Sequence, residues 1–123
     1  MKYRQYKDNT DNKPTRYFSD RQEKTIAKSI NGKQTSNSGA TPYNKGDIST
    51  DKVLVECKTK TKSSNSISIQ KDWIDKLISE SIFMKKPFWS LFFNFGPDEP
   101  NYVIISESLY LQLLDKINNN EIE

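Results

Sequence analysis

The sequence predicts an α/β domain in which a mixed β-sheet is flanked by helices, in the order helix, three strands, helix, two strands, helix. Two features predict this class: apolar residues recur at helical spacing in several segments, and aromatic or β-branched runs lie between those segments. Helical and strand segments that alternate along one chain are typical of a sheet with helices packed on it. With 123 residues, the chain has room for one such domain.

The first helix is predicted in "SDRQEKTIAKSING", residues 19–32. Ser19, with Gln22 three residues later, forms a capping-box pattern, and Gly32 stands where a helix commonly ends. The preceding residues, 1–18, are polar and basic and show no periodicity, which indicates a flexible N-terminal arm.

Glu23 falls on the apolar stripe of this helix, which Ile26, Ala27 and Ile30 define. A carboxylate that faces inward is unfavourable unless a cation or a metal pairs with it. Alternatively, Glu23 lies at the edge of the first turn, where the helix dipole stabilises a negative charge. The sequence leaves both explanations open.

A polar loop is predicted at Asn31–Lys45, followed by a two-strand unit whose second strand covers residues 53–60, "VLVECKTK". Alternation along this strand places Val53, Val55 and Cys57 on one face, which is an ordinary core face. The opposite face holds Leu54, Glu56, Lys58 and Lys60.

The register of this hairpin decides where Asp47 lies. If residues 49–52 close the turn, Ile48 lies opposite Val53 and Asp47 lies opposite Leu54. Residues directly opposite one another share a face, so Asp47 would join the charged face of the second strand.

Residues 66–69, "SISI", are predicted as a short third strand, and "QKDWIDKLISESIF" at 70–83 as a helix that Pro87 prevents from continuing. The stripe of this helix that is expected to face the core consists of Trp73, Ile74, Leu77, Ile78 and Ile82.

Two further strands and a helix complete the predicted domain. The aromatic run at 88–95, "FWSLFFNF", indicates a buried strand, and "NYVII" at 101–105 indicates another after a turn. The closing helix at 106–117 has Ser106 as its N-cap. We therefore expect one folded domain at 19–118 and a short tail at 119–123, with a final stripe of Tyr110, Leu113, Leu114 and Ile117.

The net charge of +3 conceals an asymmetry. Residues 1–62 include 14 basic and 7 acidic side chains, whereas residues 63–123 include 5 and 9. Such a division favours a polyanionic partner, although a solvated basic surface is the simpler alternative.

Composition also restricts the chemistry and the compartment. The chain has no histidine, which excludes Ser-His-Asp and Cys-His catalysis and histidine metal sites. Its one cysteine permits no internal disulfide and favours a reducing compartment. The N-terminal segment lacks the apolar region of a signal peptide, and no apolar run is long enough for a membrane span. We expect a cytoplasmic protein, in the host cytoplasm if phage-encoded, with no membrane partner.

Asp47, Glu56 and Lys58 together suit phosphodiester hydrolysis. Two carboxylates that converge from adjacent strands provide the hard oxygen ligands that Mg²⁺ prefers. A neighbouring lysine stabilises the negative charge that develops at phosphorus. Glu23 would add a further carboxylate from a helix packed on the sheet. The alternative is a cluster of surface ion pairs.

These residues, in this order, resemble the PD-(D/E)XK nuclease superfamily, and most closely its archaeal-type Holliday-junction resolvases and similar small phage endonucleases. In that family a helix glutamate is followed by a loop with serine and glycine, here "TSNSGAT", an aspartate, and an E-x-K strand with an amphipathic helix after it. The resemblance covers residues 19–105 and implies a restriction-endonuclease-like core, although Gly46 stands where the family motif has proline. The matching residues are Glu23, Asp47, Glu56 and Lys58.

The resemblance implies a role for each of these four residues. Asp47 and Glu56 would bind Mg²⁺, or Mn²⁺ in its place, together with the backbone carbonyl of Cys57. Lys58 would position the attacking water or help to deprotonate it, and Glu23 would complete the site directly or through water. The thiol of Cys57 is expected to point into the core and to be inert.

Basic and hydroxyl side chains near this face are expected to contact DNA phosphates, which would make binding salt-dependent and weakly sequence-specific. One of two loop serines matches a serine near the active site of the resolvases, and Gln70 is a possible accessory residue. The candidate DNA contacts are Arg21, Lys33, Ser36, Ser38, Lys45, Lys60 and Lys62.

The implied function is that of a Mg²⁺-dependent, structure-selective DNA endonuclease that resolves four-way junctions by paired, symmetric hydrolysis. Two symmetric incisions need two active sites, so we expect a homodimer. The alternatives are another nuclease of the same superfamily, restriction-like or specific for single strands, and a non-catalytic nucleic-acid-binding module.

Overall fold

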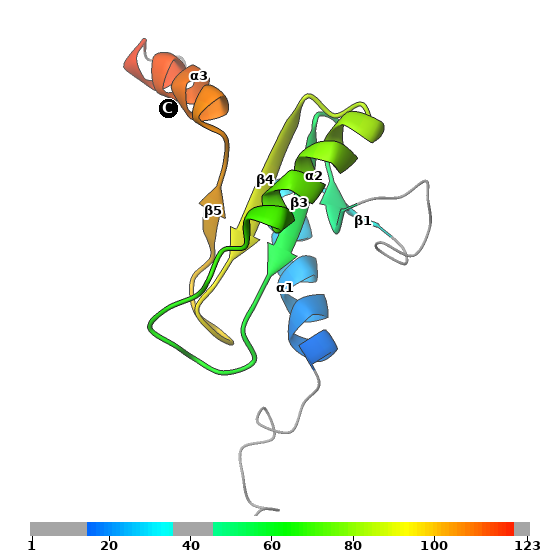
Figure 1. Cartoon of the computed structure of the whole chain (residues 1–123), viewed down its shortest axis with the longest axis vertical. Coiled ribbons are helices and arrows are strands. Elements are labelled where there is room, and N and C mark those ends of the chain that lie inside the picture. Colours follow the sequence, from blue (N-terminus) through cyan, green and yellow to red (C-terminus); the bar gives the residue numbers. More distant parts are fainter. Residues whose placement is uncertain (1–14, 36–45, 120–123) are drawn as a thin grey trace, which may run out of the picture.

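The computed structural model describes residues 15–35 and 46–119 (Figure 1). Its three helices and five strands follow the predicted order, so the prediction of an α/β fold is confirmed. The elements are α1 (Thr15–Ile30), β1 (Lys33–Gln34), β2 (Ile48–Ser49), β3 (Val53–Lys58), α2 (Lys71–Phe83), β4 (Phe88–Phe93), β5 (Tyr102–Ile104) and α3 (Glu107–Asn118).

The strands form one mixed sheet in the order β1-β2-β3-β4-β5. β3 and β4 are parallel, and α2 is the crossover between them, whereas the other neighbouring strands are antiparallel. β3 lies at the centre of the sheet, so the residues on this strand are held on both sides by backbone hydrogen bonds.

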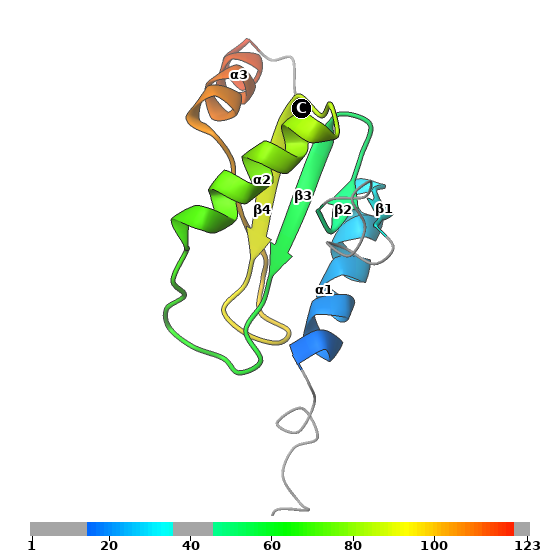
Figure 2. The ribbon, with the colours of Figure 1, turned by 45° about the vertical axis from the view of Figure 1, so that its right-hand side comes forward.

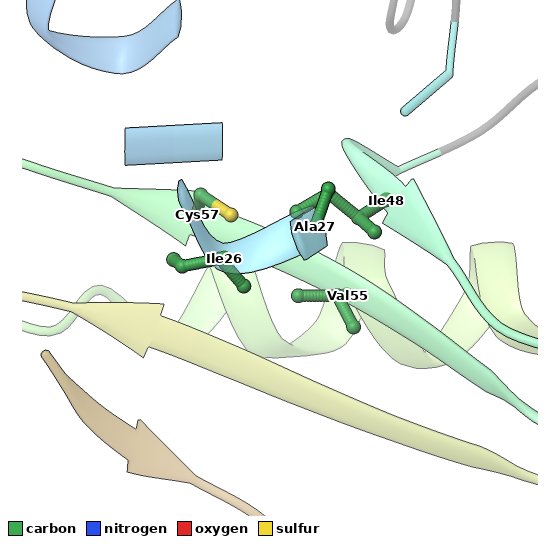
Figure 3. Packing of buried hydrophobic residues seen from close by; sticks show 5 residues of the cluster. All are labelled: Ile26, Ala27, Ile48, Val55 and Cys57. Carbon is green, nitrogen blue, oxygen red and sulfur yellow. The ribbon is translucent and has the colours of Figure 1, made fainter. Parts of the chain in front are cut away.

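The sheet is covered by α2 on one face and by α1 near β2 and β3 on the other (Figures 1 and 2). On the α2 side, Leu54 and Leu91 pack with Leu77 of the helix. Side chains of β3 alternate between the faces, and both faces are buried, which explains why this strand is the most apolar part of the first half. Under α1 the core consists of Ile26, Ala27, Ile48, Val55 and Cys57 (Figure 3).

The predicted third strand at residues 66–69 is wrong. These residues belong to an irregular connection between β3 and α2, and the third strand is instead β1, inside the segment predicted as a loop. Within the connection, Ser64 Oγ donates to the carbonyl of Ser66, which also accepts a hydrogen bond from Lys60 Nζ at 2.8 Å. Such local side-chain bonds compete with strand pairing in serine-rich segments.

Helix α1 begins at Thr15, four residues before the predicted cap at Ser19. Phe18 explains the longer helix, because it is only 3% exposed and extends the inward-facing side of α1 by a turn. The predicted arm therefore has its last four residues in a helix, and residues 1–14 lie outside the described part of the chain.

At its other end, α1 stops at a left-handed residue. Asn31, with φ of 55°, takes that conformation in place of Gly32, and the Gly32 N–H donates to the carbonyl of Ala27 at 2.8 Å. A Cβ on Gly32 would lie 2.7 Å from Cγ2 of Ile48, so the glycine serves the close approach of β2 to the helix.

Helix α2 confirms its predicted stripe only in part. Leu77 is buried and Trp73, Ile74 and Ile78 are half-buried, but Ile82 is 71% exposed, because Ser81 and Met84 face the core at this end of the helix instead.

Helix α3 forms where predicted, and Ser106 caps it by accepting a hydrogen bond from Leu109 N–H at 3.0 Å. Its predicted stripe does not join the core, because no residue of α3 is buried. Across the described ranges, no helix is both long enough and apolar enough to cross a membrane.

Gly46, just before β2, should not tolerate alanine. Its φ of +74° is left-handed, and a Cβ there would lie 2.7 Å from Cδ1 of Leu54. We expect Gly46→Ala to lower the free energy of unfolding by about 1–3 kcal/mol, measured by urea denaturation. Ser49→Ala on neighbouring β2 is the control and should change it by less than about 0.5 kcal/mol. Equal small effects would show that Leu54 does not restrict this turn.

Candidate functional site

The β2–β3 hairpin has a register that differs from the predicted one. Ile48 lies opposite Val55 rather than Val53. The turn is shorter than the predicted four residues, because Thr50 N–H donates to the Val53 carbonyl at 2.9 Å and Thr50 Oγ1 accepts from Val53 N–H at 3.1 Å. The shift moves Asp47 away from Leu54, its predicted partner.

Asp47 occupies a break in the regular pairing. Its N–H donates to the carbonyl of Val55 at 2.9 Å, and Val55 is the residue already paired with Ile48. Two residues of one strand therefore face one residue of the other, as in a β-bulge, which re-aims a side chain. Asp47 reaches the site through this irregularity and not through the regular alternation that we assumed.

The Asp47 carboxylate lies beside the backbone of β3, on the side where β2 pairs with it. Its Oδ2 accepts a hydrogen bond from the Cys57 N–H at 2.7 Å, and the residue is only 8% exposed. A bond from a backbone N–H to a carboxylate is stronger than one between neutral groups. The Asp47 carbonyl also accepts from Thr35 N–H at 3.0 Å, so the residue is fixed from both neighbouring segments.

Glu56 and Lys58 follow on β3 and form an ion pair, with 3.4 Å between Nζ and Oε2. Both side chains are largely buried, at 20% and 30% exposure. The Lys58 ammonium also lies over the ring of Trp73 in α2, 4.5 Å from its centroid, as in a cation–π contact. The lysine is thereby held between a carboxylate and an aromatic face.

Glu23 is half-buried on α1, on the side of the helix that packs on the sheet. Because α1 begins at Thr15, Glu23 is in the third turn, and the explanation by a first-turn dipole is wrong. Burial, followed by repulsion from Asp47, raises the pKa of Glu23 from 4.5 to about 7, although a hydrogen bond with Gln34 opposes the shift. Glu56 also repels Glu23, so three carboxylates interact here.

Glu56 shows the same kind of shift. Burial, followed by repulsion from Asp47, raises the pKa of Glu56 to about 7, against the opposing attraction of Lys58 and Lys76. Two glutamates near one aspartate thus hold protons more tightly than free glutamates do. An additional positive charge at this place would relieve the repulsion.

These residues offer the oxygen ligands that a hard divalent cation prefers. Among residues 15–35 and 46–119, no three carboxylate or thiol side chains come together closely enough to form a metal-binding group. Two of the oxygens have other partners, since Asp47 accepts from the Cys57 N–H and Glu56 pairs with Lys58. The donor chemistry fits Mg²⁺, which needs only one or two carboxylates from the protein.

The Cys57 side chain lies within range of the charges of these carboxylates but belongs to the core side of β3. It is buried with Ile26 and Val55 beneath α1 (Figure 3). Burial raises the pKa of the Cys57 thiol, which keeps it protonated and unreactive. The side chain belongs to the core, as predicted.

The predicted DNA contacts have different surroundings. Lys33 on edge strand β1 and Lys62 are exposed, whereas Lys60 Nζ is bonded to the Ser66 carbonyl. Arg21 pairs with Asp98 at 2.8 Å. Ser36, Ser38 and Lys45 lie outside the described residues.

Gln70 is the N-cap residue of α2, and its carbonyl accepts from the Trp73 N–H at 3.1 Å. It is therefore one turn from the residue that covers Lys58, and its side chain makes no cap hydrogen bond.

Sequence reasoning missed two residues that hold Lys58 in place. Trp73 was assigned to the core stripe alone. Gln22 was taken as half of a capping box, yet it is buried, and its Nε2 donates to the Lys58 carbonyl at 2.9 Å and to Asn101 Oδ1 at 3.3 Å. A glutamine one residue before Glu23 on the inward side of a helix was the available signal.

No family model matches this chain, and no curated protein or solved structure is significantly similar to it.

The raised pKa of Glu56 predicts how stability depends on pH. The pKa of the Glu56 carboxyl is about 7 in the folded state, against 4.5 for an unperturbed glutamate, so the folded protein binds this proton more tightly than the unfolded chain does. The free energy of unfolding therefore falls as the pH rises from 4.5 through 7. Glu56→Gln removes this cost. In EDTA we expect the variant to melt at a higher temperature than wild type at pH 8, with a difference that vanishes near pH 4.5.

Glu23→Gln should behave in the same way, because the pKa of the Glu23 carboxyl is also raised. Glu99→Gln, on an exposed loop, is the control and should leave the pH dependence of the melting temperature unchanged. A melting temperature for Glu56→Gln that is lower than wild type at pH 8 would contradict the repulsion between these carboxylates.

Proposed function

We propose that this chain is a Mg²⁺-dependent, structure-selective DNA endonuclease that resolves four-way junctions by paired, symmetric phosphodiester hydrolysis. The observation that supports it most is the Asp47 carboxylate, bound to the Cys57 N–H at 2.7 Å, beside the Glu56–Lys58 pair. The mixed sheet, with a crossover helix between β3 and β4, agrees with the restriction-endonuclease-like core that the resemblance implies.

The proposed metal ligands are Asp47, Glu56 and the Cys57 carbonyl, with Glu23 direct or through water. When bound, Mg²⁺ would supply a positive charge that polarises the phosphodiester and lowers the pKa of water, and Mn²⁺ would substitute for it. Burial, followed by repulsion from Asp47, raises the pKa of both glutamates, and the repulsion favours such a cation.

Lys58 is proposed to act on the reacting phosphate. Hydrolysis forms one bond from a water oxygen to phosphorus and breaks one bond from phosphorus to a sugar oxygen, which takes up a proton. Negative charge grows on the phosphate oxygens meanwhile, and a fixed ammonium stabilises it. Trp73 and Gln22 fix this ammonium by holding the side chain and the backbone of Lys58, respectively.

Substrate choice is proposed from charge and symmetry. The basic excess of residues 1–62 supplies phosphate contacts that do not read sequence. A four-way junction has two-fold symmetry, so a homodimer with two equal sites would cut it symmetrically. A general nuclease of the same superfamily and a binding-only module are the outcomes that the following tests would otherwise favour.

Replacing either proposed carboxylate ligand by its amide should abolish DNA cleavage but not DNA binding. We expect Asp47→Asn or Glu56→Gln to reduce cutting of a labelled four-way junction in Mg²⁺ by at least about 100-fold, since each removes a ligand of the proposed ion. Junction binding in gel-shift assays in Ca²⁺ should change less than about threefold. EDTA should abolish cutting by wild type.

Asp51→Asn is the matched control, because Asp51 is an exposed aspartate in the turn of the same hairpin. It should cut at the wild-type rate. Wild-type cutting by Asp47→Asn would overturn the site, binding without any cutting would favour the binding-only module, and equal cutting of duplex and junction would favour the general nuclease.

Neutralising Lys60 and Lys62 should weaken binding to all sequences alike. Each contact between a lysine and a phosphate releases counterions from the DNA. The double variant Lys60→Gln, Lys62→Gln should therefore also reduce the magnitude of the slope of log affinity against log salt concentration by about 1 to 2. Lys85→Gln, beyond the opposite end of α2, is the control and should leave both unchanged. Losses confined to particular sequences would instead show base contacts.

A further inference from the structure

The surface formed by β5 and α3 is unusually apolar for an exposed region. We call it the α3–β5 surface. Monomeric proteins rarely expose large contiguous apolar patches, and those that occur commonly mark interaction sites. The residues that define it, all between 36% and 53% exposed, are Val103, Tyr110, Leu111, Leu113 and Ile117.

A groove of about 480 Å³ adjoins this surface on the α1 side of the sheet. Leu109 and Leu113 of α3 form one wall, Phe88 and Phe92 of β4 form the floor, and Ile30 at the end of α1 closes the other side. α1 covers β2 and β3 but leaves β4 and β5 open on this face, as Figures 1 and 2 show. The groove and the α3–β5 surface therefore form one continuous apolar area.

The chain itself has no suitable segment to cover this area. Outside the described residues lie 1–14, 36–45 and 120–123, whose apolar side chains, apart from prolines, show no helical or strand periodicity: Met1, Tyr3, Tyr6, Ala40, Tyr43 and Ile122. Burial of an apolar groove requires a partner with several apolar side chains on one side. α3 itself has that pattern, with Tyr110, Leu113, Leu114 and Ile117 at helical spacing.

We propose that a second copy of this chain covers the α3–β5 surface, with its α3 packed beside α3 and over the groove around a two-fold axis. Each copy then supplies both the helix and the groove, as an isologous interface requires. Charge is complementary too, because Lys52 lies at the groove and α3 is net acidic, with Glu107 and Asp115 against Lys116. A two-fold axis makes each of these contacts twice.

The size of the area agrees with a stable dimer. A standard interface takes roughly 20–30 residues from each partner. The residues of α3 and β5 and the lining of the groove together reach that range. The inference deepens the proposed function, which needs two copies, but the mass of the protein tests it without any cleavage.

Light scattering tests the interface directly. We expect wild type at about 50 μM to have twice the chain mass of 14.3 kDa, and its melting temperature to rise with protein concentration. Ile117→Glu and Tyr110→Glu should each give a folded monomer whose melting temperature is independent of concentration, because both side chains are exposed within one copy. Lys52→Glu should weaken the dimer at least tenfold.

Phe83→Glu is the matched control, since Phe83 is an apolar residue of α2 with 57% exposure. It should remain a dimer, and so should Glu56→Gln. A monomeric wild type, or a dimer that survives Ile117→Glu but not Phe83→Glu, would overturn the proposal. A wild-type dimer that cuts no DNA would overturn the proposed function alone.

Discussion

The hydrogen bond from Cys57 N–H to Asp47 Oδ2 is the contact on which the candidate site depends. In a regular antiparallel pair, this N–H of β3 would donate to a backbone carbonyl of β2, but here it donates to the Asp47 side chain. The bulge before Ile48 permits it, and Gly46 permits the bulge through its left-handed backbone and its contact with Leu54. Because the bond is short and buried, the carboxylate is fixed at the edge of β3 and interacts with groups from both sides of the sheet.

This position explains the electrostatics. Glu23 comes from α1, on one side of the sheet, and Glu56 projects from β3, yet both are repelled by Asp47. The repulsion is unfavourable for folding above pH 7 and is not needed for packing, since the apolar core lies elsewhere. Proteins tolerate such unfavourable clusters where a function uses them. The carboxylates repel one another despite the nearby ammonium groups of Lys58 and Lys76, and this repulsion is the physical basis for proposing a bound cation.

Periodicity predicted most of the fold, because the helices α2 and α3 and the strands β3 to β5 follow simple patterns of apolar residues. It failed where local bonds or neighbours decided the outcome. The serine-rich segment at 66–69 is tied at Ser66 to the preceding residues Ser64 and Lys60, and the two-residue strand β1 has no pattern to detect. Asp47 was grouped with Glu56 correctly but for a wrong reason, because alternation along a strand does not foresee a bulge. The periodicity of α3 predicted its apolar stripe but not what covers it, since a sequence does not distinguish a face buried within a chain from one buried between chains.

The apolar groove and the Glu56–Lys58 pair lie on opposite faces of the same strand. Val53 and Val55 of β3 line the groove on the α1 side, whereas Glu56 and Lys58 alternate with them and project to the α2 side, where Lys58 lies over Trp73. A partner seated on the groove would therefore leave the Glu56–Lys58 pair accessible. Such a separation allows association on one face of β3 while the geometry around Lys58 stays fixed on the other.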